Sequence, residues 1–209
     1  MSAHVFARIA GHRLAIVPQP CYEIARADHP SAVDVRCRWE NRWLWARITP
    51  DNGEFIWQLG EGTASLADVL DVVTGPDLDD WRIETSRYLC AWPSGFRIQA
   101  TDFPRSPSVF DLIGPGGSLV YVQSPNRKIP AIEELVAPGQ EIVGFDRGEL
   151  IESVELAYTH DGEPWRQRHL VLTRLGREYA VSMQCRAGFA DVAIAAATLV
   201  ATSLVPSTE

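Results

Sequence analysis

The residues best suited to chemistry stand together in the last third of the chain. His160, Asp161 and Glu163 occur in one short stretch, and His169 follows them. Histidines beside carboxylates can bind zinc or transfer protons. Because the pair Asp161-Gly162 also adopts the left-handed backbone of a tight turn at low cost, the same stretch is typical of a β-hairpin loop. No third ligand stands at a suitable spacing, so the sequence predicts no metal, and His160, Asp161 and His169 are kept as an alternative ligand site.

A glycine-rich stretch, residues 114–117, could hold a phosphate group with its backbone amides. It lacks the Lys-Ser/Thr pair of a P-loop and the spacing of a dinucleotide fingerprint, so a tight turn before a strand is the favoured interpretation. The chain also has no Gly-x-Ser-x-Gly elbow and no cysteine-protease motif. We therefore expect no cofactor and no catalytic residue, and we leave open whether the protein is an enzyme while favouring a non-enzymatic role.

Tryptophans and arginines interleave in the first third of the chain, which is the most unusual feature of the sequence. They are Trp39, Trp43, Trp45, Trp57, Arg36, Arg38, Arg42 and Arg47. In an extended strand Trp43 and Trp45 would share one face and aliphatic residues the other, so both faces would be apolar. Tryptophan with arginine is typical of binding hot spots. We expect a protein-binding surface at Trp43, Trp45, Arg42 and Arg47, and the alternative is that the tryptophans fill a core.

The composition is that of an ordinary globular protein. The chain has 209 residues, of which 46% are hydrophobic and 22% charged, and its formal charge is −8. Nucleic acids and anionic membranes attract basic surfaces, so neither partner is expected. Residues 1–18 contain no uninterrupted signal-peptide core, no apolar run reaches membrane-spanning length, and the 4 cysteines form no Cys-x-x-Cys pair. We therefore expect a cytoplasmic protein with reduced cysteines.

The last third of the chain predicts consecutive strands closed by a helix. Apolar residues recur at every second position in 151–159 and 179–185, and the apolar run 165–173 lies between them. In residues 189–204 the apolar spacing changes to i, i+3, i+4, which is typical of an amphipathic helix. Such a helix would cover the apolar face of the three-stranded meander.

The first third repeats this order of elements. Period-two patterns predict strands at 33–39, 42–49 and 54–59, and a serine-aspartate capping box predicts a helix over residues 65–73. We therefore expect an α+β protein of two related lobes, each an antiparallel β-meander covered by a helix.

The boundary between the two lobes is expected at the acidic stretch 76–80. This division gives an N-terminal domain of residues 1–76 and a C-terminal domain of residues 81–209. The middle of the chain is less regular. There we expect strands at 81–92, 96–100, 118–123 and 141–145, a short helix at 106–113, and one or two helical turns at 129–136.

The end of the chain also resembles a known family. A late strand at 178–185 with an apolar face, followed by a helix at 189–204 that ends in the pair Ser203-Leu204, is similar to the close of Mog1/PsbP-like domains, including the bacterial DcrB type. The similarity is confined to the C-terminal half. It implies an α/β sandwich used for binding and assembly, as in import cofactors, photosystem accessory subunits and secretion chaperones or adaptors, and it implies no catalytic residues.

These observations favour a non-enzymatic binding or adaptor protein of bacterial type that acts in the cytoplasm by protein–protein contact, as a chaperone, an accessory factor or an immunity-type protein. The alternative is an enzyme or a small-ligand-binding protein that uses a groove between the lobes, with His160, Asp161 and His169 near its mouth. A homodimer built on the tryptophan-bearing strand is a third expectation.

Overall fold

The computed structural model describes most of the C-terminal part of the chain in full and the N-terminal part as backbone strands. The described residues are 5–9, 12–16, 22–26, 33–39, 42–51, 54–59, 70–74, 82–85, 87–101, 108–123 and 129–207. Within these ranges, side chains are described from residue 82 onward, with the exception of residue 100.

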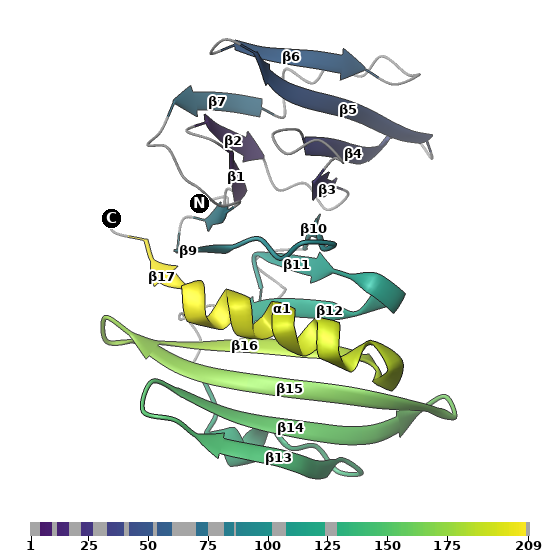
Figure 1. Cartoon of the computed structure of the whole chain (residues 1–209), viewed down its shortest axis with the longest axis vertical. Coiled ribbons are helices and arrows are strands. Elements are labelled where there is room, and N and C mark those ends of the chain that lie inside the picture. The colour runs from purple at the N-terminus through teal and green to yellow at the C-terminus, as the bar shows by residue number, and fades with distance from the viewer. Residues whose placement is uncertain are drawn as a thin grey trace.

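The larger of two sheets contains 11 described strands, and every described pair is antiparallel (Figure 1). It starts with β13 (Glu141–Arg147), β14 (Ile151–His160), β15 (Glu163–Arg174), β16 (Arg177–Arg186), β12 (Leu119–Gln123), β11 (Phe110–Ile113) and β10 (Arg97–Ala100). It continues with β3 (Tyr22–Arg26), β4 (Val33–Trp39), β5 (Arg42–Asp51) and β6 (Glu54–Leu59). Therefore β13 forms one edge of this sheet and β6 forms the other.

A smaller sheet contains 6 described strands, which also pair antiparallel. Their order is β17 (Val205–Pro206), β9 (Tyr88–Ala91), β8 (Arg82–Thr85), β1 (Val5–Ile9), β2 (His12–Ile16) and β7 (Leu70–Thr74). Two antiparallel sheets, with one α-helix among the described residues, make this an α+β protein, as the sequence predicts.

Two tight turns join β14, β15 and β16 into a meander. The φ angles are 51° at Asp161 and 78° at Gly162 in the first turn, and 49° at Leu175 and 72° at Gly176 in the second. Left-handed backbone at both central positions suits the right-handed twist of the strands that such a turn joins. The continuous ladders from β14 to β15 and from β15 to β16 confirm the predicted three-stranded meander.

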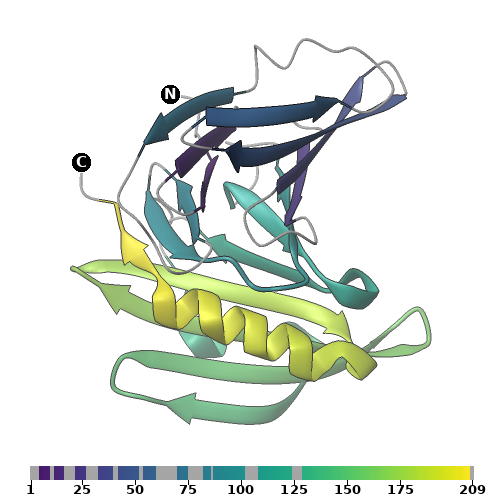
Figure 2. The same ribbon diagram turned by 45° about the horizontal axis from the view of Figure 1, so that its top comes forward.

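The helix α1 (Ala190–Ser203) covers one face of this meander (Figure 2). It contacts β16, β15, β12 and β9. Its buried side chains are Ala193, Ala196, Ala197, Val200 and Ala201. Because most of these are alanines, the helix backbone can lie close to the sheet, and its side chains join the main hydrophobic core. The predicted helix and its packing on the strands are therefore confirmed.

A short 3₁₀ turn, η3 (Ile132–Leu135), covers the opposite face of β14 and β15. Ile132 packs with Val154 and Leu156 in a second, smaller cluster of buried residues. Val171 borders this cluster, whereas Leu170 and Leu172 on either side of it belong to the core beneath α1. The two sets separate because successive side chains of a strand point to opposite faces of the sheet. The helical turn expected in this part of the chain is thus confirmed.

The helix predicted over residues 65–73 is wrong where the structure describes it. Leu70–Thr74 forms β7, which pairs antiparallel with β2, and residues 65–69 lie outside the described residues. The capping box and the apolar spacing favour a helix locally, but this segment is rich in valine and threonine, and pairing with a distant strand overrides a weak helical preference. The first lobe therefore does not repeat the helix-covered arrangement of the second over residues 70–73.

The short helix predicted over residues 106–113 is also wrong in its described part. Phe110–Ile113 forms β11, in which Phe110 and Leu112 are buried and the residues between them are half-buried. This alternation is that of a strand, and β11 pairs with β10 on one side and β12 on the other.

The strands predicted at 33–39, 42–49 and 54–59 are confirmed as β4, β5 and β6. The ladders between β1 and β8 and between β3 and β10 join the N-terminal strands to the segment that follows residue 81. Because the stretch 76–80 lies outside the described residues, the domain boundary there and the common origin of the two lobes stay predictions.

Candidate functional site

The three residues of the alternative ligand site lie at two places on one hairpin. His160 and Asp161 are at the exposed tip, with His160 Nε2 at 3.6 Å from Asp161 Oδ2. His169 lies in the middle of β15 opposite Val154, whereas His160 is opposite Glu163. At a rise of about 3.3 Å per residue, the two histidines are roughly 20 Å apart along the hairpin. The structure brings His160 and Asp161 together and separates both from His169, and a ligand there stays a prediction.

Contacts between aromatic rings stabilise the hairpin tip. The rings of Tyr158 and Trp165 are stacked with their centroids 6.3 Å apart, and the His160 ring meets Trp165 edge-on at 5.7 Å. Aromatic pairs in these geometries contribute stability beyond the area that they bury. These contacts therefore stabilise the conformation of the exposed tip.

His169 belongs to the interior of the sheet. Its side chain is only 4% exposed, and its Nδ1 lies 2.8 Å from the hydroxyl oxygen of buried Ser182. Burial lowers the pKa of His169 from 6.5 to about 4, because the charged imidazolium loses its hydration. A neutral imidazole paired with a buried hydroxyl is suited to bridging β15 and β16.

The described residues hold no group of three or more His, Cys, Asp or Glu side chains placed to bind a metal ion. Within the same part of the chain, no helix is long and apolar enough to cross a membrane. Cys90 and Cys185 are free thiols and both are buried, whereas the side chains of Cys21 and Cys37 lie outside the described residues.

The tryptophan-bearing strand is β5, which lies between β4 and β6 in the large sheet. Backbone register places Trp43 opposite Arg38 and Trp45 opposite Arg36 of β4. The side chains of the predicted binding residues Trp43, Trp45, Arg42 and Arg47 lie outside the described residues, so this partner-binding surface stays a prediction.

At the far edge of the same sheet, β13 carries large apolar side chains in contact with solvent. Among the described residues it pairs only with β14. The exposed fractions are 52% for Ile142, 44% for Val143 and 43% for Phe145, and 66% for Leu150 in the turn that follows. We call these four residues the edge patch. An edge strand with exposed apolar residues offers unpaired backbone groups to another strand, and soluble proteins usually avoid such an edge.

Part of the edge patch lies on the same sheet face as the small core cluster, at its solvent-exposed side. Ile142 is opposite Leu156 and Phe145 is opposite Val154, so both side chains lie on the sheet face that η3 covers. The guanidinium carbon of Arg147 lies 5.2 Å from the centre of the Phe145 ring, and Arg147 forms an exposed salt bridge with Glu133 of η3. Arg147 thus connects the edge patch to η3 on this face of the sheet.

The strand has a β-bulge inside the edge patch. The register with β14 shifts between Ile142 and Gly144, which leaves Val143 without an opposite residue. Residues 144–147 then pair regularly with β14. A bulge bends an edge strand and ends flat pairing, and bulges often lie next to functional sites.

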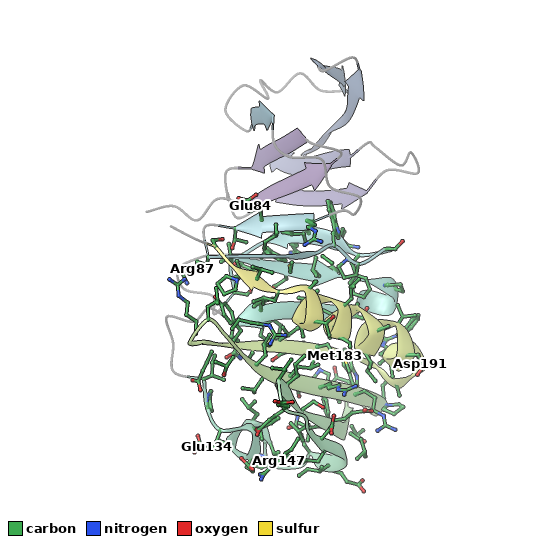
Figure 3. All side chains as sticks on the ribbon, turned by 60° about the vertical axis from the view of Figure 1, so that its left-hand side comes forward. Glu84, Arg87, Glu134, Arg147, Met183 and Asp191 are labelled. Carbon is green, nitrogen blue, oxygen red and sulfur yellow. The ribbon has the colours of Figure 1, made fainter. Side chains whose placement is uncertain are left out.

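Negative charge is concentrated around the edge patch. Between residues 129 and 155 the carboxylates are Glu133, Glu134, Glu141, Asp146, Glu149, Glu152 and Glu155, and Arg147 is the single basic side chain. All of these carboxylates except half-buried Glu155 are exposed. Figure 3 shows Glu134 and Arg147 at the same end of the molecule. By contrast, the neighbouring strands β15 and β16 carry an excess of basic residues: Arg166, Arg168, Arg174, Arg177 and Arg186 against Glu163 and Glu178.

The strand predicted at 141–145 is confirmed as part of β13, but the sequence-based predictions include no binding surface on it. Two features of the sequence could have indicated one. The run Ile142-Val143-Gly144-Phe145 does not alternate with polar residues, and acidic residues flank it on both sides.

No protein-family model and no curated protein matches this chain. One solved structure is similar to it, the crystal structure of LpqN involved in cell envelope biogenesis of Mycobacterium tuberculosis. The TM-score is 0.42 and the sequence identity is 14%, over 58% of this chain and 83% of that chain.

Proposed function

We propose that the protein is a non-enzymatic binding protein that acts by protein–protein contact through the edge patch. The observation that supports this proposal is the exposure of Ile142, Val143 and Phe145 on a strand with one described neighbour. Partner proteins often add a strand to such an edge, where backbone hydrogen bonds supply affinity and side chains supply specificity.

The cellular setting proposed with it is that of a bacterial-type cytoplasmic chaperone, accessory factor or immunity-type protein. The resemblance of the C-terminal half to Mog1/PsbP-like domains agrees with a role in binding and assembly. The alternative contact surface is that of Trp43, Trp45, Arg42 and Arg47, because tryptophan and arginine are frequent at the centres of interfaces.

The experiment compares capture of partner proteins from a native cell extract, after chemical crosslinking, by matched variants. The double variant Ile142→Lys/Phe145→Lys places charge in the edge patch. The control Leu175→Lys places the same charge on a leucine that is 80% exposed in the β15–β16 turn. We expect the wild type and the control to capture a partner that the double variant does not.

Capture that is equal for all three proteins would contradict the proposal. A Trp43→Ala/Trp45→Ala variant is run in parallel. Loss of the partner in that variant alone would assign the binding surface to β5. Thermal melts of every variant establish that a lost partner reflects a changed surface and not an unfolded chain.

A further inference from the structure

We infer that the edge patch binds an extended, positively charged peptide segment of a partner protein, which adds to β13 as a further strand with apolar residues at alternate positions. This inference rests on the proposed function and specifies the chemistry of the partner.

Backbone pairing sets the shape of the partner. β13 is 7 residues long and pairs with β14 on one side, and no other described strand pairs with it. An extended peptide satisfies the outward backbone groups of an edge strand, whereas a helix cannot. Residues 144–147, beyond the bulge, pair regularly with β14 and so offer the straightest part of the edge.

Side chains set the apolar positions of the partner. Ile142 and Phe145 lie on the η3 face and are both about half exposed. Cross-strand neighbours on one face of a sheet lie in contact, so a peptide strand beside β13 would place every second side chain against this face. Aliphatic residues at those positions would cover Ile142 and Phe145.

The negative charge around the edge patch determines which peptide sequence it prefers. Glu141 and Asp146 are exposed on β13 itself, Glu149 lies in the turn after it, and Glu152 is on β14. The single basic side chain of residues 129–155, Arg147, is already paired with Glu133. A peptide with lysine or arginine between its apolar residues would meet this field with complementary charge, which speeds association and selects among partners.

The same charges disfavour a second copy of the chain as the occupant. In a dimer that joins two β13 edges, the carboxylates of both copies would come together. Like charges on adjacent strands are unfavourable, and the bulge at Val143 interrupts the flat edge that such a dimer needs. The occupant that fits is therefore a basic segment of another protein.

The test uses the full chain and a defined probe. The probe is a fluorescent peptide of alternating lysine and valine, about as long as β13, and the control peptide has glutamate in place of lysine. Binding is followed by fluorescence anisotropy at low and high salt, and amide hydrogen exchange reports which strands are protected.

We expect the basic peptide to bind at least about tenfold more tightly than the acidic peptide, to weaken as salt rises, and to slow exchange of the β13 amides. Both Ile142→Lys/Phe145→Lys and Glu141→Lys/Asp146→Lys should weaken binding by about tenfold or more, and Leu175→Lys should leave it unchanged. The second double variant keeps the apolar side chains, so the inference can be tested even if the first one fails to fold.

Several results would overturn the inference: no binding of the basic peptide, equal binding of the acidic peptide, binding without protection of β13, or a wild-type dimer that the edge variants abolish. If a cellular partner is captured through the edge patch but the basic peptide does not bind, the inference fails and the proposed function stands. If neither capture nor peptide binding depends on the edge patch, both fail.

Discussion

Because His169 is buried, the free energy of unfolding is expected to decrease on acidification. Its pKa is lowered from 6.5 to about 4 by burial, so the folded chain holds it neutral where the unfolded chain would bind a proton. The contribution of His169 to the free energy of unfolding is therefore fully present above the unfolded pKa of 6.5. It falls as the pH drops from there toward the folded pKa of about 4.

The size of this effect follows from the two pKa values. Each unit of difference corresponds to about 1.4 kcal/mol, so the contribution lost reaches roughly 3 kcal/mol at the acid end of the window. Between about pH 7 and about pH 5 the expected loss is about 2 kcal/mol. This is a large fraction of the net stability of about 5–15 kcal/mol that is typical of a domain.

The assay is urea unfolding of the wild type and of His169→Gln at the two pH values. Glutamine retains a polar group that can hydrogen-bond Ser182, but it does not titrate. We expect the wild type to lose about 2 kcal/mol more than the variant on acidification, since all other titrating groups are common to both proteins. An equal loss in the two proteins would refute the assignment of a depressed pKa to His169.

Two further predictions concern packing and backbone conformation. At Gly116 φ is +64° and an added Cβ would overlap the Phe189 ring, so Gly116→Ala should lower the free energy of unfolding by about 1–3 kcal/mol. The control Gly176→Ala, in a turn with open space around the added Cβ, should lower it by less. Equal thermal melts for the two variants would contradict this prediction. Ala197 is fully buried on the sheet-facing side of α1, whereas Ala195 of the same helix is exposed. Ala197→Leu should therefore lower the free energy of unfolding by about 1–3 kcal/mol, and Ala195→Leu should leave it nearly unchanged. Chemical unfolding of both leucine variants measures the difference. An unchanged stability of the Ala197→Leu protein would contradict the packing of this face of α1 against the sheet.

The C-terminal meander and its helix could be predicted from the sequence because local and tertiary preferences agree there. The apolar residues of β14 and β16 recur at period two, Asp161-Gly162 supplies the left-handed turn, and the spacing changes to that of a helix in α1. Each strand of this meander pairs with its neighbour in the chain, so local patterns were sufficient.

The segments 70–74 and 110–113 could not be predicted in the same way. β7 becomes a strand because it pairs with β2, which lies far away in the sequence, and β11 becomes a strand between β10 and β12, its neighbours in the chain. Apolar residues in such short segments fit a helix or a strand, and the pairing partner decides between them.

The candidate site could be predicted less well than the fold. The sequence predicted the strand at β13, but its position at the sheet edge depends on which strands pair across the whole sheet. The hairpin that carries His160 and His169 was recognised, yet only the register shows that these residues lie far apart.

The most direct test of the central claim is amide hydrogen exchange of the complex formed with a captured cellular partner. Binding through the edge patch predicts slowed exchange in β13, with exchange in β5 unchanged, since an added strand protects the amides to which it bonds. Slowed exchange at Trp43 and Trp45 of β5, with β13 exchanging as in the free protein, would contradict the claim.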